Sequence, residues 1–176
     1  MNADNRRVDL AKGEADVALR MARPTELDPV ARKALVLGWA VYASKDYAAK
    51  YGLPASAEKL PGHRLVHYTD EFLVQPAIRW FESFRQPNAT VTRVNSTDMA
   101  INVIAPGQSI GMAPCFEVEG RENFVRVFPK PIALTPGWIV YQESARNTAR
   151  VRVVIDALAE LLEARADFFA GRTTAR

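Results

Sequence analysis

The chain has 176 residues, of which 48% are hydrophobic and 24% charged, and a formal net charge of +3 from 23 basic and 20 acidic residues. This composition is typical of a globular protein that buries a core without metals or disulfides, and the dispersed basic residues give no nucleic-acid footprint. The single cysteine, Cys115, excludes an internal disulfide and fits a reducing compartment.

In chain order, the first half of the sequence predicts short strands that alternate with short helices. The predicted strands are 15–19, 35–43 and 64–68. The predicted helical segments are 4–13, 44–50, 56–60 and a segment after residue 70. Ser44 is expected to cap the second of these helices, and Gly52 to end it. The fourth is indicated by apolar residues at helical spacing, namely Leu73, Ala77, Trp80, Phe81 and Phe84.

The second half continues the alternation. Strands are predicted at 90–94, 110–113, 124–128 and, after a turn at 135–137, at 138–141. Ser96 or Thr97 is expected to cap a helix that ends before Pro106. Asn147 or Thr148 caps the final helix. The predicted apolar stripe of that helix is Val151, Val154, Ile155, Leu158, Leu161 and Leu162.

This alternation predicts an α/β fold with a mostly parallel sheet. Proline-rich passages on both sides of a central block suggest two lobes joined by two crossovers, at 23–29 and 131–136. The first lobe would consist of 1–22 plus 137–176, and the second of 30–130. Ligands of open α/β sheets bind at the carboxyl ends of strands and often between lobes, so we expect a binding site there.

Four stretches of the sequence, in this order and spacing, resemble one known family. They are 9–20 (DLAKGEADVALR), 39–47 with 60–64 (WAVYASKDY and LPGHR), 95–96 leading to 107–114 (NS and GQSIGMAP), and 151–158 (VRVVIDAL). Together they resemble the effector-binding, or substrate-binding, domain of LysR-type transcriptional regulators. The resemblance implies a type 2 periplasmic-binding-protein-like fold, in which a small molecule binds between two lobes and closure is relayed to an N-terminal winged helix-turn-helix.

Two features depart from the family's pattern. Residue 1 falls where the first lobe of the family is already half built, so the resemblance implies a truncated chain with an incomplete first lobe and no DNA-binding domain of its own. In addition, Ser109 occupies the second glycine of the family's Gly-x-Gly-Ile pattern. A serine is small enough for many such turns.

Six residues are candidates for effector binding. Asn95, Ser96 and Thr97 open a predicted helix, whose free N–H groups and partial positive charge suit a carboxylate or another polar effector. The alternative is that Ser96 or Thr97 only caps its own helix. Tyr68 and Thr69 end a strand and, by the resemblance, lie where the family contacts its effector, whereas Asp70 suits a turn.

The sixth candidate, Arg20, ends the strand before the first crossover. Its guanidinium could bind a carboxylate in bidentate fashion. The alternative is a salt bridge or a solvated hinge residue. His63 and His67 flank a strand with no third ligand near, so we predict no metal site and no cofactor. The sequence offers no nucleophile with a base and no phosphate loop, so we do not predict an enzyme.

The leading hypothesis is therefore a cytoplasmic effector-sensing module that controls transcription through a DNA-binding domain absent from this chain. Its expected partners are a small carboxylate or aromatic metabolite, and a second copy or a full-length regulator. Direct contact with nucleic acid or a membrane is not expected. Two alternatives stay open: a truncated remnant that dimerises with a full-length regulator without sensing, and a solute-binding protein for transport. The polar N-terminus, which lacks an apolar signal segment, argues against export.

Overall fold

The computed structural model describes residues 9–10, 12–21, 30–87, 91–146 and 148–172. The chain divides into two compact units. Unit 1 comprises Met1–Leu37 and Thr135–Phe169, and unit 2 comprises Gly38–Leu134 and Ala170–Arg176. The predicted crossover at 23–29 and most of the predicted helix at 4–13 lie outside the described residues.

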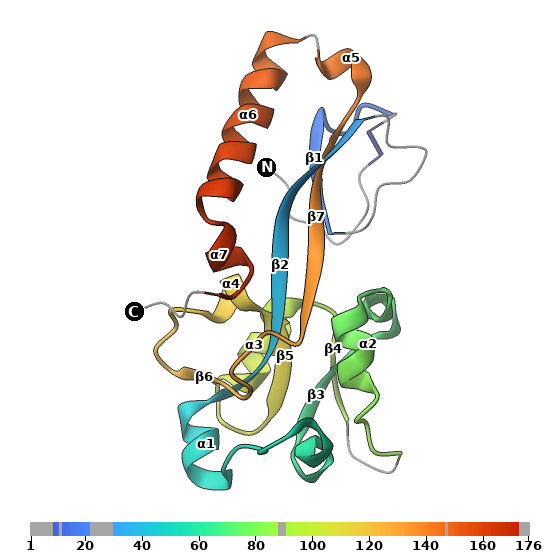
Figure 1. Cartoon of the computed structure of the whole chain (residues 1–176). Coiled ribbons are helices and arrows are strands. Elements are labelled where there is room, and N and C mark those ends of the chain that lie inside the picture. The colour runs from blue at the N-terminus through green and yellow to red at the C-terminus, as the bar shows by residue number, and fades with distance from the viewer. Residues whose placement is uncertain (1–8, 11, 22–29, 88–90, 147, 173–176) are drawn as a thin grey trace. The chain divides into compact units, whose positions relative to one another are not determined.

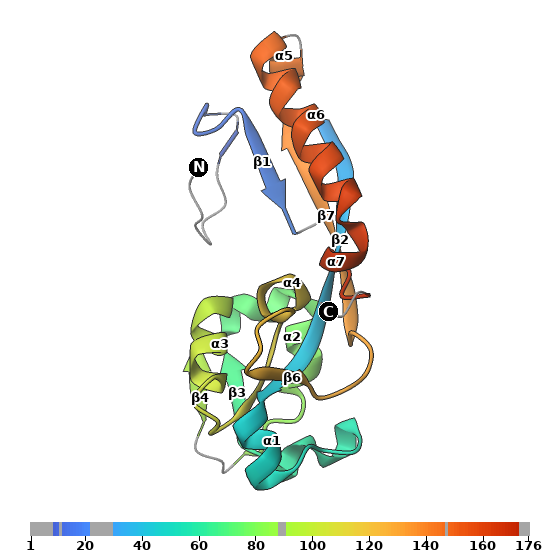
Figure 2. The ribbon, with the colours of Figure 1, turned by 90° about the vertical axis from the view of Figure 1, so that its left-hand side faces the viewer.

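Unit 1 contains a strand pair and the C-terminal helices. β1 (Val17–Arg20) pairs antiparallel with β7 (Ala133–Tyr141), and β7 lies next to β2 (Val30–Ser44) in the sheet. Helices α5 (Glu143–Arg146), α6 (Ala149–Ala164) and α7 (Ala166–Phe169) follow. Both ribbon views show α6 running alongside β7 and the first part of β2 (Figures 1 and 2).

The turn predicted at 135–137 is wrong, because these residues lie inside β7. Pairing with β1 reaches only to Trp138, so Pro136 lies outside the hydrogen-bonded stretch with that strand. Gly137 is required by packing rather than by a turn. A Cβ added there would lie 2.7 Å from Met21 Cε and 2.8 Å from Leu35 Cγ.

Helix α6 buries a narrower stripe than the sequence pattern predicts. Val151, Ile155 and Leu162 are buried as expected, and Ala159 joins them. The prediction is wrong for Val154 and Leu161, which are 49% and 51% exposed. The buried face follows i, i+4 and i+3 steps along one line of the helix, and these two residues lie beside that line.

Unit 2 is built on a mixed sheet with the strand order β2-β5-β3-β4, and β6 (Phe124–Arg126) pairs antiparallel with β2. β3 (Leu65–Tyr68) lies between β5 (Ile110–Pro114) and β4 (Thr92–Val94) and runs parallel to both. β5 and β2 are antiparallel. The α/β prediction is confirmed, but the prediction of a mostly parallel sheet is wrong, because β1–β7, β2–β5 and β2–β6 are antiparallel and only β3 pairs in parallel with its neighbours among the described strands.

The helices of unit 2 mostly begin and end where the sequence predicts. α1 (Lys45–Tyr51) begins after Ser44, whose Oγ accepts a hydrogen bond from the Tyr47 N–H at 3.0 Å, and ends at Gly52 with a φ of 71°. Two 3-10 helices, η1 (Ala57–Gly62) and η2 (Asp70–Val74), precede β3 and α2 (Pro76–Glu82). Leu73 therefore belongs to η2 rather than to the predicted helix. α3 (Thr97–Ile104) and α4 (Cys115–Val118) flank β5.

The core of unit 2 lies between the sheet and these helices. Its largest fully buried side chains include Tyr42, Leu60, Tyr68, Ile78, Phe81, Ile101, Ile104, Ile110 and Met112. Ser109, the departure from the family's glycine, is buried, and its Oγ donates to the Val103 carbonyl at 3.2 Å. Within the described ranges, no helix is long and apolar enough to cross a membrane.

Candidate functional site

Five of the six predicted effector residues lie at one edge of the sheet in unit 2. β3 runs parallel to both of its neighbours, so the carboxyl ends of β4, β3 and β5 meet at the same edge. Tyr68 and Thr69 stand at the end of β3, and Asn95, Ser96 and Thr97 follow β4. The structure therefore brings these five residues together, through elements that can be followed in Figure 1.

A hydrogen bond links the segments that follow β4 and β5, the two strands on either side of β3. Thr97 Oγ1, at the start of α3, donates to Glu117 Oε1, in α4, at 3.0 Å. Because β3 lies between β4 and β5, this contact spans the end of β3, where Thr69 lies. The helix cap is Ser96, whose Oγ accepts from the Met99 N–H at 3.2 Å. Ser96 rather than Thr97 therefore caps α3, and the Thr97 hydroxyl bonds to Glu117 instead.

Glu117 is a further residue at this edge, and it is not among the six residues predicted from the sequence. Burial raises the pKa of its carboxyl, and Asp98 acts in the same direction, while the Thr97 hydroxyl and Arg121 oppose the shift. Its Oε2 is buried and has no hydrogen-bond partner among the residues that the structure describes. In the sequence Glu117 is one ordinary acidic residue, 20 positions from Thr97, and no local spacing marks it.

Tyr68 and Thr69 differ in what they can offer a ligand. The Tyr68 side chain is 1% exposed, and its hydroxyl donates to the Met112 carbonyl at 2.9 Å, so that hydroxyl already serves the fold. The Thr69 N–H donates to the Val94 carbonyl at 2.9 Å. Thr69 Oγ1 is buried, without a hydrogen-bond partner in the described part of the chain. Thr69 thus has unused hydrogen-bonding capacity at the strand end, whereas the Tyr68 hydroxyl is already bonded within the fold.

Asn95 and Arg20 are the predicted effector residues with the least evidence for a role at this edge of the sheet. Asn95 is exposed at the end of β4. Arg20 is the last residue of β1, opposite Trp138, and belongs to unit 1. Both take part in interactions within the structure. Asp70 forms a salt bridge with Arg93 at 3.0 Å, which fits the structural role expected for it. The part of Asn95 and Arg20 in effector binding stays a prediction.

This edge of the sheet therefore presents hydroxyl and carboxyl groups, and the Tyr68 ring packs against Phe72 with ring centroids 4.9 Å apart. Over the described ranges, no group of three or more His, Cys, Asp or Glu side chains could hold a metal ion. Thr69 Oγ1 and the Glu117 carboxyl can each accept a hydrogen bond, and the threonine can also donate one. A buried polar atom without a partner costs about 1–3 kcal/mol, so a ligand that satisfies it is favoured.

The two histidines have separate partners. His63 Nδ1 lies 2.9 Å from the Tyr47 hydroxyl, whereas His67 Nδ1 lies 2.7 Å from Glu82 Oε2. Both histidines line a hollow of about 540 Å³ at the other edge of the same sheet. Burial lowers the pKa of His67, and Arg85 and Arg93 add to this effect, while Glu82 opposes it. The buried imidazole is therefore neutral at pH 7.

The free energy of unfolding should decrease as the pH falls below 6.5, the ordinary pKa of a histidine. The unfolded chain then takes up a proton at His67 that the folded chain resists, and the loss approaches about 1.4 kcal/mol per pH unit while the folded imidazole stays neutral. Urea unfolding at pH 7.5, 6.0 and 5.0 measures this slope. His67→Gln removes the titrating group, and an unchanged slope in that variant would contradict the assignment.

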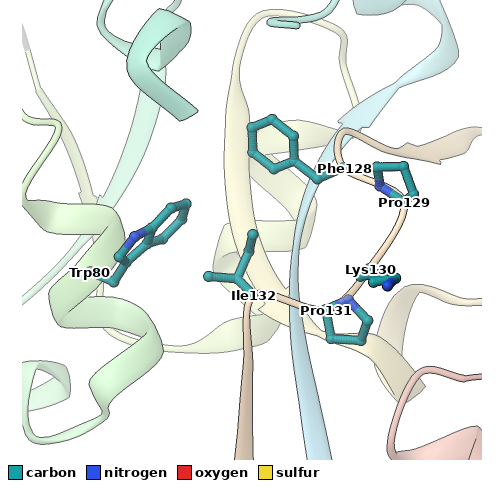
Figure 3. A pocket seen from close by; sticks show the side chains of 6 residues that line it. All are labelled: Trp80, Phe128, Pro129, Lys130, Pro131 and Ile132. Carbon is teal, nitrogen blue, oxygen red and sulfur yellow. The ribbon is translucent and has the colours of Figure 1, made fainter. Parts of the chain in front are cut away.

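A second hollow, of about 480 Å³, is mainly apolar. Figure 3 shows Trp80 of α2 on one side, and Phe128 and Ile132 pointing toward it from the segment between β6 and β7. Lys130 lies on the far side of that segment from Trp80. None of the six predicted effector residues lines either of these two hollows.

Comparisons with known proteins agree with the geometry. Residues 1–163 match the family model of the LysR substrate binding domain. A curated HTH-type transcriptional regulator of Xanthomonas campestris pv. campestris (strain 8004) is 41% identical over 64 residues, which are 36% of this chain and only 19% of that protein. The chain thus matches about a fifth of the length of this relative.

Solved structures with the same fold include three regulators. The CrgA regulatory domain of Neisseria meningitidis has a TM-score of 0.73 at 22% identity, over 90% of this chain and 81% of that one. Full-length AphB, a virulence activator of Vibrio cholerae, has a TM-score of 0.68 at 19% identity, over 90% and 56%. The CcmR regulatory domain of Synechocystis PCC6803, in complex with 2-PG, has a TM-score of 0.64 at 13% identity, over 88% and 76%.

At these identities the solved structures establish the fold, which is the type 2 periplasmic-binding-protein-like fold that the sequence predicts. The family assignment comes from the match that covers 163 of the 176 residues. The strand order, the polar strand ends in unit 2 and this match lead to one conclusion: the chain belongs to the LysR substrate-binding domain family, the regulatory part of LysR-type transcriptional regulators.

Proposed function

We propose that this chain is the effector-sensing module of a LysR-type transcriptional regulator, and that it controls transcription through a separate DNA-binding domain. The observation that carries the proposal is the polar strand edge of unit 2, where Thr69 Oγ1 and Glu117 Oε2 are buried without partners among the described residues. The CcmR regulatory domain, described in complex with 2-PG, supports the idea that this fold binds small polar molecules.

The effector would hydrogen-bond to Thr69 and Glu117, with Thr97 holding the carboxyl in place at 3.0 Å. A carboxylate effector is compatible with this site only if Glu117 is protonated, and the raised pKa of Glu117 favours that state. A neutral or hydroxylated effector meets no such condition. Arg20 stays a predicted effector residue, whose guanidinium could bind a carboxylate in bidentate fashion.

The experiment is a ligand screen followed by matched variants. Thermal unfolding of the chain is measured with 2-PG, succinate, benzoate and tryptophan. A ligand at a hundred times its Kd stabilises by about 2.7 kcal/mol, which for a domain of this size raises the Tm by roughly 5–10 °C. Thr69→Val and Glu117→Gln should each reduce the shift, because each removes a group that the effector contacts.

Glu122→Gln is the matched control for Glu117→Gln, since Glu122 is an exposed glutamate outside the proposed site. It should leave the ligand-induced shift unchanged. Sensing at this edge would be refuted if no compound in the panel shifts the Tm. Equal shifts in the wild type, Thr69→Val and Glu117→Gln would refute the placement of the site.

A second candidate function is pairing with another regulator chain, with or without sensing. The observation that favours it is the exposure of apolar residues on α6, where Val153 is 68%, Val154 49% and Leu161 51% exposed. Analytical ultracentrifugation tests it. A dimer that Leu161→Glu dissociates would support pairing through this face, whereas a monomer at high concentration would refute self-pairing.

A further inference from the structure

The hollow that contains the two histidines lies at the opposite edge of the unit 2 sheet from the proposed effector site. It is lined at the amino ends of the same parallel strands, by Leu65 of β3, Thr92 of β4 and Ser109 just before β5. At about 3.3 Å per residue, Leu65 lies roughly 13 Å and His67 roughly 7 Å along the chain from Thr69, and no lining residue of the hollow belongs to the proposed effector site. This hollow is therefore a distinct place in the molecule, beyond the proposed function.

His67 gives this hollow a hydrogen-bond acceptor. The imidazole is 3% exposed, and its Nδ1 lies 2.7 Å from Glu82 Oε2. Arg85 Nε lies 2.7 Å and Arg93 Nη2 3.9 Å from the other oxygen of Glu82, and a carboxylate paired with guanidiniums accepts hydrogen bonds. Nδ1 must therefore donate. In a neutral imidazole the remaining nitrogen, Nε2, then carries a lone pair and accepts.

Arg64 gives the hollow a positive charge. It is exposed, it lines the hollow beside His63, and no acidic side chain in the described part of the chain forms a salt bridge with it. The charges nearest to His67 are those of Glu82, Arg85 and Arg93, and Arg93 also pairs with Asp70. The carboxylates of Glu82 and Asp70 are thus paired with the guanidiniums of Arg85 and Arg93. The Arg64 guanidinium is not part of this group and can attract an anion.

The other walls are of mixed polarity. Phe84, Leu65 and Val103 are apolar, Gln86, Gln108 and Ser109 are polar, and the volume of about 540 Å³ lies in the range of small-molecule sites. An apolar surface with a few convergent polar groups orients a ligand as well as binding it. A cation would be repelled by the guanidiniums, and an acid without a hydroxyl would leave His67 Nε2 without a donor.

We propose that this hollow is a second ligand site, which binds a small hydroxylated carboxylic acid with an apolar body. Its carboxylate would bind Arg64, its hydroxyl would donate to His67 Nε2, and its apolar body would lie against Phe84 and Leu65. Arg64 is exposed and His67 is buried, so the ligand would bind with its carboxylate outward and its hydroxyl inward.

The test uses four probe compounds on the whole chain. 3-Hydroxyphenylacetate and 4-hydroxyphenylacetate carry both groups, phenylacetate lacks the hydroxyl, and 4-hydroxyphenylacetamide lacks the charge. Isothermal titration should show one hydroxy acid binding about tenfold more tightly than phenylacetate and than the amide, since each comparison removes one hydrogen-bonded group. Absence of binding at millimolar concentrations of both hydroxy acids would overturn the proposal.

Variants locate the binding. Arg64→Gln, a substitution at an exposed position, should weaken the hydroxy acid about tenfold and abolish its advantage over the amide. His67→Phe should abolish the advantage of the hydroxy acid over phenylacetate. If that variant fails to fold, the Arg64→Gln result and the four-compound comparison still decide the question.

Two control variants separate this site from the proposed effector site. Arg32→Gln removes an exposed arginine in unit 1, and Thr69→Val alters the other edge of the sheet. Both should leave the affinity within twofold of the wild type. Loss of binding in Thr69→Val with retention in Arg64→Gln would place the acid in the effector site and overturn the second site, while leaving the proposed function intact.

Discussion

Glu119→Gln is expected to lower the free energy of unfolding by about 3 kcal/mol, because it leaves a buried guanidinium without its counter-charge. Glu119 Oε1 accepts from Arg126 Nη2 at 2.6 Å and Nε at 3.1 Å, and from the Tyr42 hydroxyl at 2.6 Å. The Arg126 and Glu119 side chains are only 12% and 8% exposed. For a chain of this size the Tm should fall by roughly 6–12 °C, measured by calorimetry.

The same guanidinium also links Gly171 to the rest of unit 2. Arg126 Nη2 also donates to the Gly171 carbonyl at 3.0 Å, and Nη1 donates to the Pro129 carbonyl at 3.2 Å. Gly171 has a φ of +65° and lies so close to Cys115 that a Cβ there would lie 2.8 Å from the Cys115 Cβ. Burial raises the pKa of the Cys115 thiol, so this cysteine is a packing residue of the cluster.

A matched control is available three positions further along the chain. Glu122→Gln makes the same substitution at an exposed residue, and its effect should stay within about 0.5 kcal/mol. The double variant Glu119→Gln/Arg126→Met removes both charges and should be less destabilised than the sum of the single variants. If Glu119→Gln and Glu122→Gln unfold at the same temperature, the buried pair does not stabilise the fold as argued.

Leu162→Ala and Leu161→Ala, two identical substitutions at neighbouring positions, should differ in their free energy of unfolding by at least about 1.5 kcal/mol. Leu162 is 4% exposed on the inner face of α6, and truncation of a buried leucine costs about 2–5 kcal/mol through lost burial and the cavity that remains. Leu161 is 51% exposed, so its truncation should change the stability by less than about 0.5 kcal/mol. Urea unfolding of both variants measures the difference.

This pair of variants also tests the orientation of α6. The apolar pattern of the sequence includes both leucines, and only one of them packs inward in the structure. Equal losses in the two variants would mean that the helix face is rotated or that a partner covers Leu161. Ultracentrifugation of Leu161→Ala separates these two explanations, since a partner contact predicts weaker self-association and a rotated helix does not.

Local chemistry was sufficient for much of the fold. Ser44 and Gly52 mark the ends of α1, because a side-chain cap and a left-handed glycine act within one helical turn. The same holds for Ser96 at α3. The order and spacing of the four motifs led to the family and its fold, and both are confirmed by the match over residues 1–163.

Contacts between residues far apart in the sequence could not be predicted from it, because they depend on which strands become neighbours. Thr97 contacts Glu117, 20 residues away in the sequence, because the strand order β5-β3-β4 brings the segments after β4 and β5 together. His67 contacts Glu82, 15 residues away, because the crossover through α2 returns to β3. The burial that raises the pKa of Glu117 and lowers that of His67 is likewise a property of the packed sheet. Local patterns predicted the elements, whereas the electrostatics of the site arose from their packing.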